Sequence, residues 1–265
     1  MSATKTEVAE GVTAGVITVR SYAETALPHL ERLISSNAAV MEELSNKIVA
    51  DVEVGKSLLI FGSGHSSLFP MELYHRAGGA SFIIPVVADF LMPSAGPSVV
   101  RALERTPGVA TAILDRAQPV EGEMIWISSQ SGINGAVVDL ALEAKKRGLF
   151  TVAFTSRAHS AAVQSRHPSG KRLFEVCDRV VDLGGVVGDA CVSITANVDG
   201  TDSVMAGPLS TLGSVFLGHS ILVSACAALE QLGIRCTYTS VNTPEGEKRN
   251  RQIEAKAALR DYLLR

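Results

Sequence analysis

Residues 57–67 of the chain read SLLIFGSGHSS, and this stretch decides the class of fold. Its first part, residues 57–61, predicts a strand buried on both faces, because apolar residues follow one another instead of alternating with polar ones. The two glycines that follow allow a sharp turn and a close approach of the backbone to a ligand. Ser66 or Ser67 can cap a following helix, whose free N–H groups attract anions. The stretch therefore predicts a strand–turn–helix unit that binds a polar or anionic ligand, with an ordinary capped turn as the alternative.

The same pattern of an apolar run followed by a polar loop recurs along the chain. Further apolar runs alternate with helical patterns, and the joining loops are rich in Gly, Ser, Asp and Pro. The runs lie at residues 82–87, 124–128, 150–155 and 179–183, and the helical patterns at 66–77, 98–103, 133–146 and 209–232. Together they predict an α/β fold whose five apolar runs form a parallel sheet covered by helices. In such sheets ligands bind beyond the carboxyl ends of the strands, so the loops after the runs are the candidate sites.

Three segments are expected along the chain. Residues 1–54 predict an N-terminal helical arm, because apolar residues recur there at helical spacing, with Pro28 expected to break or start a segment. Residues 55–245 form the sheet domain, and residues 246–265 a charged, helical C-terminal tail. Within the domain, the Gly-rich residues 184–208 are expected to be mostly loop, with a short strand near 191–195.

Composition excludes several classes of protein. The net charge is −3 and no basic face is evident, so a nucleic-acid partner is not expected. The four cysteines form no CxxC pair, which favours reduced thiols in a cytoplasmic protein over disulfides or a metal site. The N-terminus does not resemble a signal peptide, and no uninterrupted apolar run reaches the roughly 18 residues of a membrane helix.

A second polar loop follows the third apolar run. Residues 128–134 read SSQSGIN and precede a clear helical pattern, so hydroxyl and backbone N–H groups gather at the mouth of a helix. No lysine follows the glycine, which argues against a nucleotide P-loop. Neutral donors and a helix dipole instead suit a phosphate monoester or another tetrahedral oxyanion. Thr155 and Ser156 repeat the pattern after the fourth run. An NAD site stays open, because Asp89 follows the second run, although Ser67 replaces the third glycine of GxGxxG.

These three loops resemble the sugar isomerase (SIS) domain over roughly residues 30–240, a family that includes phosphoheptose isomerase. The stretch GSGHSSLFPMELYHRAGG most resembles a bacterial subgroup, the UPF0309 proteins. The resemblance implies a doubly wound, flavodoxin-like parallel sheet of five strands and a phosphosugar site at the strand ends; no cofactor and no metal are expected. The implied substrate-binding residues are Gly64, Ser66, Ser129, Ser131, Gly132, Asn134 and Ser156. It also implies a homodimer or homotetramer in which neighbouring subunits share the site, and the helical arm fits that expectation.

The expected reaction is aldose–ketose isomerisation of a phosphorylated or sulfonated sugar through an enediolate, which needs a base and groups that assist ring opening. Glu72 is the candidate base, and the alternative is a surface ion pair with Arg76 one turn on. His65 would face the ligand from its turn. His219 is similar in placement to the acid/base histidine of phosphoheptose isomerase, and the alternative is a packed histidine on an apolar helix.

Other readings stay open. An amino-sugar-phosphate lyase or etherase would use the same proton removal, but such enzymes carry a second glutamate after the second strand, and residues 87–93 contain none. A non-catalytic sugar-phosphate-binding protein is the third reading. Glu72 and His75 form a single ExxH pair, which is half of a two-metal arrangement. Asp89 and either Asp199 or Asp202 lie in predicted loops, where they would bind sugar hydroxyls; the favoured alternative is that they are ordinary loop aspartates.

Overall fold

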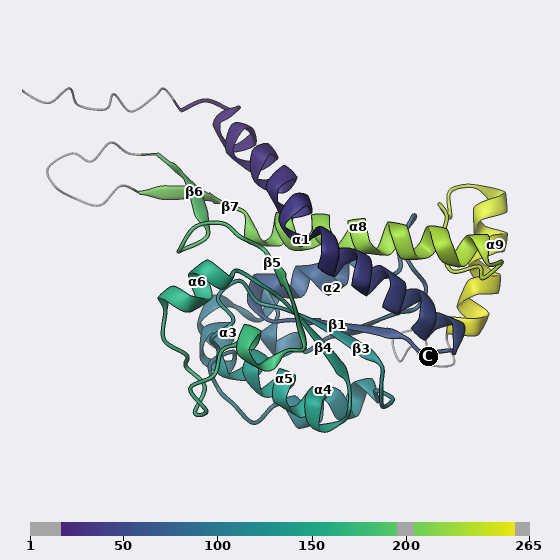
Figure 1. Cartoon of the computed structure of the whole chain (residues 1–265), viewed down its shortest axis with the longest axis horizontal. Coiled ribbons are helices and arrows are strands. Elements are labelled where there is room, and N and C mark those ends of the chain that lie inside the picture. Colours follow the sequence, from purple (N-terminus) through teal and green to yellow (C-terminus); the bar gives the residue numbers. More distant parts are fainter. Residues whose placement is uncertain (1–16, 195–203, 258–265) are drawn as a thin grey trace, which may run out of the picture.

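The computed structural model describes residues 17–194 and 204–257 and contains a five-stranded parallel sheet (Figure 1). The strand order is β2-β1-β3-β4-β5. The strands are β1 (Leu58–Gly62), β2 (Ile83–Val86), β3 (Met124–Ser128), β4 (Phe150–Thr155) and β5 (Arg179–Asp182). This order is that of flavodoxin-like sheets, so the predicted doubly wound α/β fold is confirmed.

Helices cover both faces of the sheet (Figure 1). On one face lie α1 (Ser21–Glu53), α2 (Leu68–Leu73) and α8 (Ser210–Gln231), and on the other α4 (Ala110–Ala117), α5 (Gly135–Lys146) and α7 (Leu173–Val176). Alternate residues of β1 serve the two cores: Leu58 and Ile60 pack under α1 and α8, whereas Leu59 and Phe61 pack on the α5 side. A strand that is buried on both faces must be apolar throughout, which explains the apolar run of residues 57–61.

The remaining elements are short or lie at the rim. They are the 3₁₀ turns η1 (Gly64–Ser67), η2 (Asp89–Leu91) and η3 (Pro93–Ala95), the helices α3 (Pro97–Leu103), α6 (Arg157–Ala162) and α9 (Pro244–Ala257), and the antiparallel hairpin of β6 (Ala190–Ser193) and β7 (Met205–Pro208). The short strand expected near residues 191–195 is therefore present. Its partner was not expected, because MAGP carries Gly and Pro, which strands disfavour.

Helix α1 runs without a break through Pro28, so the prediction that this proline breaks or starts a segment is wrong. Pro28 is exposed, and water can therefore satisfy the carbonyl that loses its helical N–H partner. Leu33, Leu44 and Ile48 of α1 belong to the same buried cluster as β1 and β3. Much of the predicted arm thus packs on the sheet, and its first turns extend beside β6 and β7 (Figure 1).

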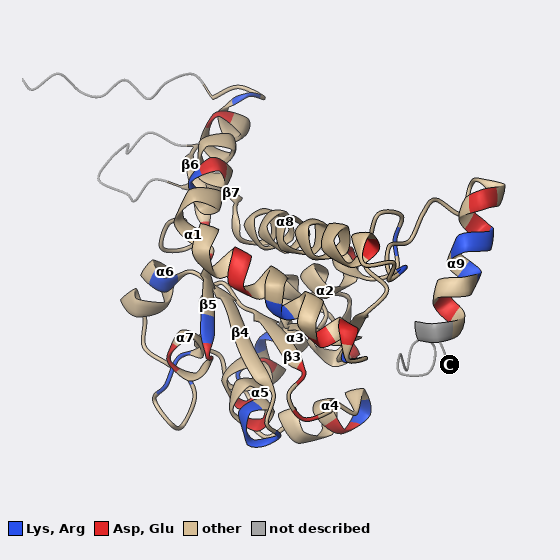
Figure 2. Ribbon diagram, turned by 45° about the vertical axis from the view of Figure 1, so that its right-hand side comes forward, with Lys and Arg blue, Asp and Glu red and all other residues tan. Residues whose placement is uncertain are grey.

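By length and composition alone, helix α8 is long and apolar enough to cross a membrane, although none of its uninterrupted apolar runs reaches that length. Half of its apolar window is buried, and Leu217, Ile221 and Leu229 belong to the core shared with α1. Figure 2 shows α8 almost free of charged residues, whereas α9 carries both signs. Core helices of water-soluble domains have the same composition, so α8 is weak evidence for a membrane span.

The sheet order determines where a ligand can bind. The chain passes from β1 outward to β2 and then crosses back to β3 on the other side of β1. The loops that follow β1 and β3 therefore diverge, although Gly62 and Ser128 are direct neighbours at the strand ends. In doubly wound sheets this switch point opens a crevice for the ligand.

Candidate functional site

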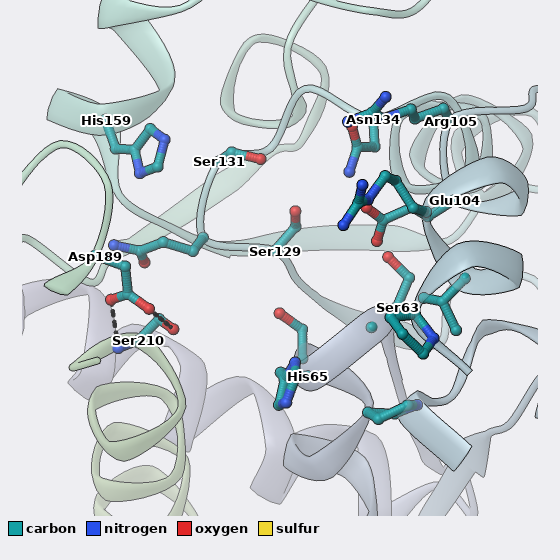
Figure 3. Close-up of a pocket in the computed structure, with 17 residues that line it drawn as sticks. Ser63, His65, Glu104, Arg105, Ser129, Ser131, Asn134, His159, Asp189 and Ser210 are labelled. Atoms are coloured by element: carbon teal, nitrogen blue, oxygen red, sulfur yellow. Dashed lines mark hydrogen bonds between the residues drawn. The ribbon is translucent and has the colours of Figure 1, made fainter. Parts of the chain in front are cut away.

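A cavity of about 660 Å³ lies at this switch point (Figure 3). It brings together six predicted residues: Gly64, His65, Ser66, Ser129, Ser131 and Asn134. The other residues that line the cavity were not predicted as site residues; they are Ser63, Pro93, Pro97, Val100, Arg101, Glu104, Arg105, Gln130, His159, Asp189 and Ser210. The two polar loops predicted from the sequence thus form facing parts of one site.

The turn after β1 is built on its two glycines. A Cβ on Gly62 would lie 2.0 Å from the carbonyl oxygen of Ser66, so no larger residue fits. Gly64 has a φ of +58°, and a Cβ there would lie 3.2 Å from Oε2 of Glu104. Ser67 is buried and donates its hydroxyl to the Gly64 carbonyl at 2.7 Å. The turn therefore presents Ser63 and His65 to the cavity at close range (Figure 3).

The loop after β3 is held by backbone and side-chain bonds. The Ser129 N–H donates to Phe154 O at 3.0 Å, and its hydroxyl accepts from the Gly132 N–H at 3.2 Å. Gly132 has a φ of +60° and is packed against Thr155 and Leu173, whose N–H donates to the Gly132 carbonyl. Ser131 faces the cavity in Figure 3. The loop leads directly into α5, whose positive end favours a bound anion.

Glu104 lies beside this loop at the end of α3 and joins it through Asn134. The Asn134 side chain interacts with Glu104, and its Oδ1 accepts a hydrogen bond from Arg166 Nη1 at 2.8 Å. Burial raises the pKa of Glu104, although Arg105, Arg166 and Asn134 act in the opposite direction. A carboxyl with a raised pKa can take up and return a proton nearer neutral pH, as acid–base catalysis requires.

The opposite wall is formed by Asp189, Ser210 and His159 (Figure 3). Asp189 Oδ1 accepts from the N–H groups of Leu209 and Ser210, and its Oδ2 accepts from the Ser210 hydroxyl at 2.6 Å. This carboxylate therefore serves mainly to cap α8. Two buried atoms nearby, Gln130 Oε1 and His159 Nδ1, have no partner among the residues that the structure describes. Buried polar atoms are nearly always bonded, so these two are candidates for ligand contacts.

Glu72 and His219 lie outside this cavity. They come from α2 and α8, which meet where a Cβ on Gly218 would lie 2.6 Å from the Phe69 ring. The packing sets His219 Nε2 3.7 Å from Glu72 Oε1, and Glu72 also pairs with Arg76. Burial and the Arg76 charge lower the pKa of His219. The structure therefore joins these two candidates to each other but not to His65.

The other predicted residues are placed as follows. Gly132 and Ser156 are buried behind the cavity lining, where the Ser156 hydroxyl accepts from the His159 N–H and caps α6. His75 is bonded to Glu254 instead of sharing a site with Glu72, and Asp89 is exposed outside the cavity. Asp199 and Asp202 lie outside the described residues. Within residues 17–194 and 204–257, no three His, Cys, Asp or Glu side chains gather as metal ligands would.

Comparison with known sequences identifies the family. Residues 21–156, about half of the chain, match the SIS domain. A UPF0309 protein of Shouchella clausii is 32% identical over 234 residues, which cover 88% of this chain and 93% of that protein. A UPF0309 protein of Oceanobacillus iheyensis is 34% identical over 204 residues, which cover 76% of this chain and 81% of that protein.

Similar solved structures include two phosphoheptose isomerases. The protein from Francisella tularensis is 13% identical with a TM-score of 0.49, covering 80% of this chain and 96% of that chain. The protein from Neisseria gonorrhoeae is also 13% identical with a TM-score of 0.49, covering 79% of this chain and 95% of that chain. These likenesses are distant, and the fold rests instead on the observed sheet order and on the family match. The chain belongs to the SIS domain family and to the UPF0309 proteins.

Proposed function

We propose that the protein is an aldose–ketose isomerase that acts on a phosphorylated sugar bound in the cavity at the switch point. One observation carries the proposal: a loop of neutral donors at a helix mouth and a carboxyl with a raised pKa line the same cavity. The first suits the phosphate and the second suits proton transfer. Membership of the SIS domain family supports a sugar phosphate as the ligand class.

The phosphate is proposed to lie on the loop of residues 129–134. Ser129 and Ser131 offer hydroxyls, Asn134 offers an amide, and α5 adds its positive end. Hydrogen bonds from such groups to a charged oxygen contribute about 1.5–3 kcal/mol each, so three of them account for millimolar to micromolar binding. A sulfonate has a similar tetrahedral shape and is the alternative anion.

Glu104 is proposed as the base. It takes the proton from carbon 2 of an open-chain aldose phosphate, and the C–H electron pair forms the enediolate. The same carboxyl then returns the proton to carbon 1, while the carbon 2 hydroxyl proton passes to the oxygen on carbon 1. His65, which lines the same cavity, is proposed to carry that second proton (Figure 3).

Glu72 and His219 remain the alternative acid–base pair. Within one chain they lie outside the cavity, so they act on its ligand only if a second copy of the chain brings them there. That arrangement corresponds to the predicted homo-oligomer with a shared site. The two assignments differ in which glutamate is indispensable, which a pair of substitutions distinguishes.

A lyase or etherase acting on an amino-sugar phosphate is the second candidate. Such enzymes are expected to carry a second glutamate after the second strand; residues 87–93 contain none, yet Glu104, also located after β2, lines the cavity. Elimination starts with the same removal of a proton beside a carbonyl. The two reactions differ in outcome, because elimination releases a leaving group and isomerisation does not.

The test is proton exchange in D₂O, followed by ¹H NMR, with glucose 6-phosphate, fructose 6-phosphate and arabinose 5-phosphate as probes. The proposal predicts loss of the carbon 2 proton signal of an aldose with formation of the ketose. Glu104→Gln should lower this rate by about 10²–10⁴-fold and change the Kd less than about tenfold. Glu72→Gln is the matched control and should keep the rate.

Other outcomes separate the alternatives. If Glu72→Gln abolishes exchange and Glu104→Gln does not, the base is Glu72 and the site is shared between copies. Release of a new product without ketose formation would identify a lyase. If the wild-type protein binds a sugar phosphate but catalyses no proton exchange, the result would favour a non-catalytic sugar-phosphate-binding protein.

A further inference from the structure

A second cavity of about 590 Å³ adjoins the first. The two share four residues, Glu104, Ser131, Asn134 and His159, so they meet at the proposed phosphate loop. The far wall of the second cavity is lined by Ile133, Val163, Gln164, Ser165 and Arg166. Ligand sites for small molecules measure about 300–1,000 Å³, and the first cavity already falls in that range. The second cavity therefore provides space that a simple sugar phosphate does not need.

Three arginines surround Glu104 at the junction of the two cavities. Arg101 and Arg105 line the first cavity and Arg166 the second, and all three interact electrostatically with Glu104. None of them lies within 4.0 Å of a carboxylate in the part of the chain that the structure describes. By contrast, Arg147 and Arg249 elsewhere in the fold form close ion pairs. The junction thus carries more positive charge than Glu104 balances.

Arg166 is held in place but keeps most of its donors. Its backbone N–H donates to Ile133 O at 2.9 Å, and Nη1 donates to Asn134 Oδ1 at 2.8 Å. A guanidinium has five N–H donors in a planar fork that matches a carboxylate or a phosphate. Four of the five therefore remain for a ligand in the second cavity, which Arg166 lines together with Ser131.

We propose that the substrate carries a second anionic group besides its phosphate, and that Arg105 and Arg166 bind this group. The inference rests on the proposed function, because it assumes that the neutral serine loop holds the phosphate. That loop needs no arginine to bind one phosphate. Guanidinium groups without a close carboxylate, beside Ser131 and Asn134, therefore point to another negative group on the same ligand. The substrate class is a phosphorylated sugar acid or a sugar bisphosphate.

The test compares three probes by isothermal titration calorimetry. Glucose 6-phosphate carries one anionic group, 6-phosphogluconate adds a carboxylate at the other end, and fructose 1,6-bisphosphate adds a second phosphate. The wild-type protein should bind at least one doubly anionic probe tenfold or more tightly than glucose 6-phosphate. The tighter of the two doubly anionic probes identifies the second group as a carboxylate or a phosphate.

Arg105→Gln and Arg166→Gln should remove this preference. The affinity of glucose 6-phosphate should change less than about threefold in Arg105→Gln, whose side chain makes no hydrogen bond to a described residue. Arg235→Gln is the matched control, because Arg235 contacts Gln252 beyond the far end of α8. That helix has 22 residues, so it separates Arg235 from Ser210 at the cavity by about 33 Å.

Two results would overturn the inference while leaving the proposed function intact. The first is equal affinity for all three probes, and the second is equal weakening of all three by Arg105→Gln. Failure of the proposed function looks different: no probe binds, or glucose 6-phosphate binds and Ser131→Ala leaves its affinity unchanged. Either of those results removes the inference as well, because its phosphate anchor is lost.

Discussion

Replacing Gly132 by alanine tests whether the phosphate loop is as tightly packed as the structure indicates. Gly132 has a φ of +60°, which costs an alanine roughly 1–2 kcal/mol. Its new Cβ would also lie 2.9 Å from Thr155 Oγ1 and 3.1 Å from Leu173 Cβ. Both neighbours are completely buried and have no room to withdraw. Crowding of this kind in a packed interior costs about 1–3 kcal/mol more.

Gly170→Ala isolates the crowding from the backbone effect. Gly170 has a similar φ of +69°, but no atom lies within 4 Å of the Cβ that alanine would add. Both variants lose the same freedom in the unfolded chain, so that contribution cancels in their difference. Each kcal/mol shifts the Tm of a domain of this size by about 2–4 °C. The Tm of Gly132→Ala should therefore fall below that of Gly170→Ala by about 2–12 °C.

The assay is thermal unfolding followed by circular dichroism, with and without glucose 6-phosphate. Gly132→Ala should also weaken stabilisation by the ligand, because its methyl group presses on the Thr155 hydroxyl, which donates to Gln130 O in the same loop. Equal Tm values for the two alanine variants would refute the reasoning, since the loop would then have space behind Gly132 and no defined anion geometry.

Two further predictions concern the site and its support. Burial holds the pKa of Glu104 above that of a free glutamate, so between these two values the folded state binds the extra proton and stability falls as pH rises. As pH rises above the pKa of a free glutamate, Glu104→Gln should therefore gain stability relative to the wild type in urea unfolding, and a stability difference that does not change with pH would contradict the raised pKa. Gly218→Ala places a Cβ 2.6 Å from Phe69 Cε2 and should cost about 1–3 kcal/mol, whereas Gly213→Ala meets only a terminal methyl of Leu33 at 3.0 Å and should cost less. A similar loss of stability in both variants would argue against close packing of α2 on α8.

The strands could be predicted from the sequence with little error. The apolar runs at 124–128 and 150–155 coincide with β3 and β4, because buried parallel strands are apolar throughout and end at polar loop residues. Short helices were missed at α4, α6 and α7. Their four to eight residues span only one or two turns, over which a 3.6-residue period does not stand out.

The candidate site was only half predictable. Ser129, Ser131 and the turn at Gly64 were found because they follow strands directly, and parallel strands end at a common edge. Glu104 and Arg166 reach the cavity from the crossover segments after β2 and β4, and their neighbours in sequence give no sign of that placement. Glu72 was predicted as the base from its position on the first helix, but within one chain its carboxylate pairs with Arg76, the alternative that the spacing of four residues also allowed, and its role stays a prediction.

The central claim, that a sugar phosphate binds on the loop of residues 129–134, is tested most directly by one pair of dissociation constants. Glucose 6-phosphate is titrated against Ser131→Ala and against Ser240→Ala, which lines a separate cavity of about 240 Å³ beside His75 and Asn250. Loss of one hydrogen bond to the charged phosphate, about 1.5–3 kcal/mol, should raise the Kd of Ser131→Ala by about 10–150-fold and leave that of Ser240→Ala unchanged. An unchanged Kd in Ser131→Ala, or a large rise in Ser240→Ala alone, would contradict the claim.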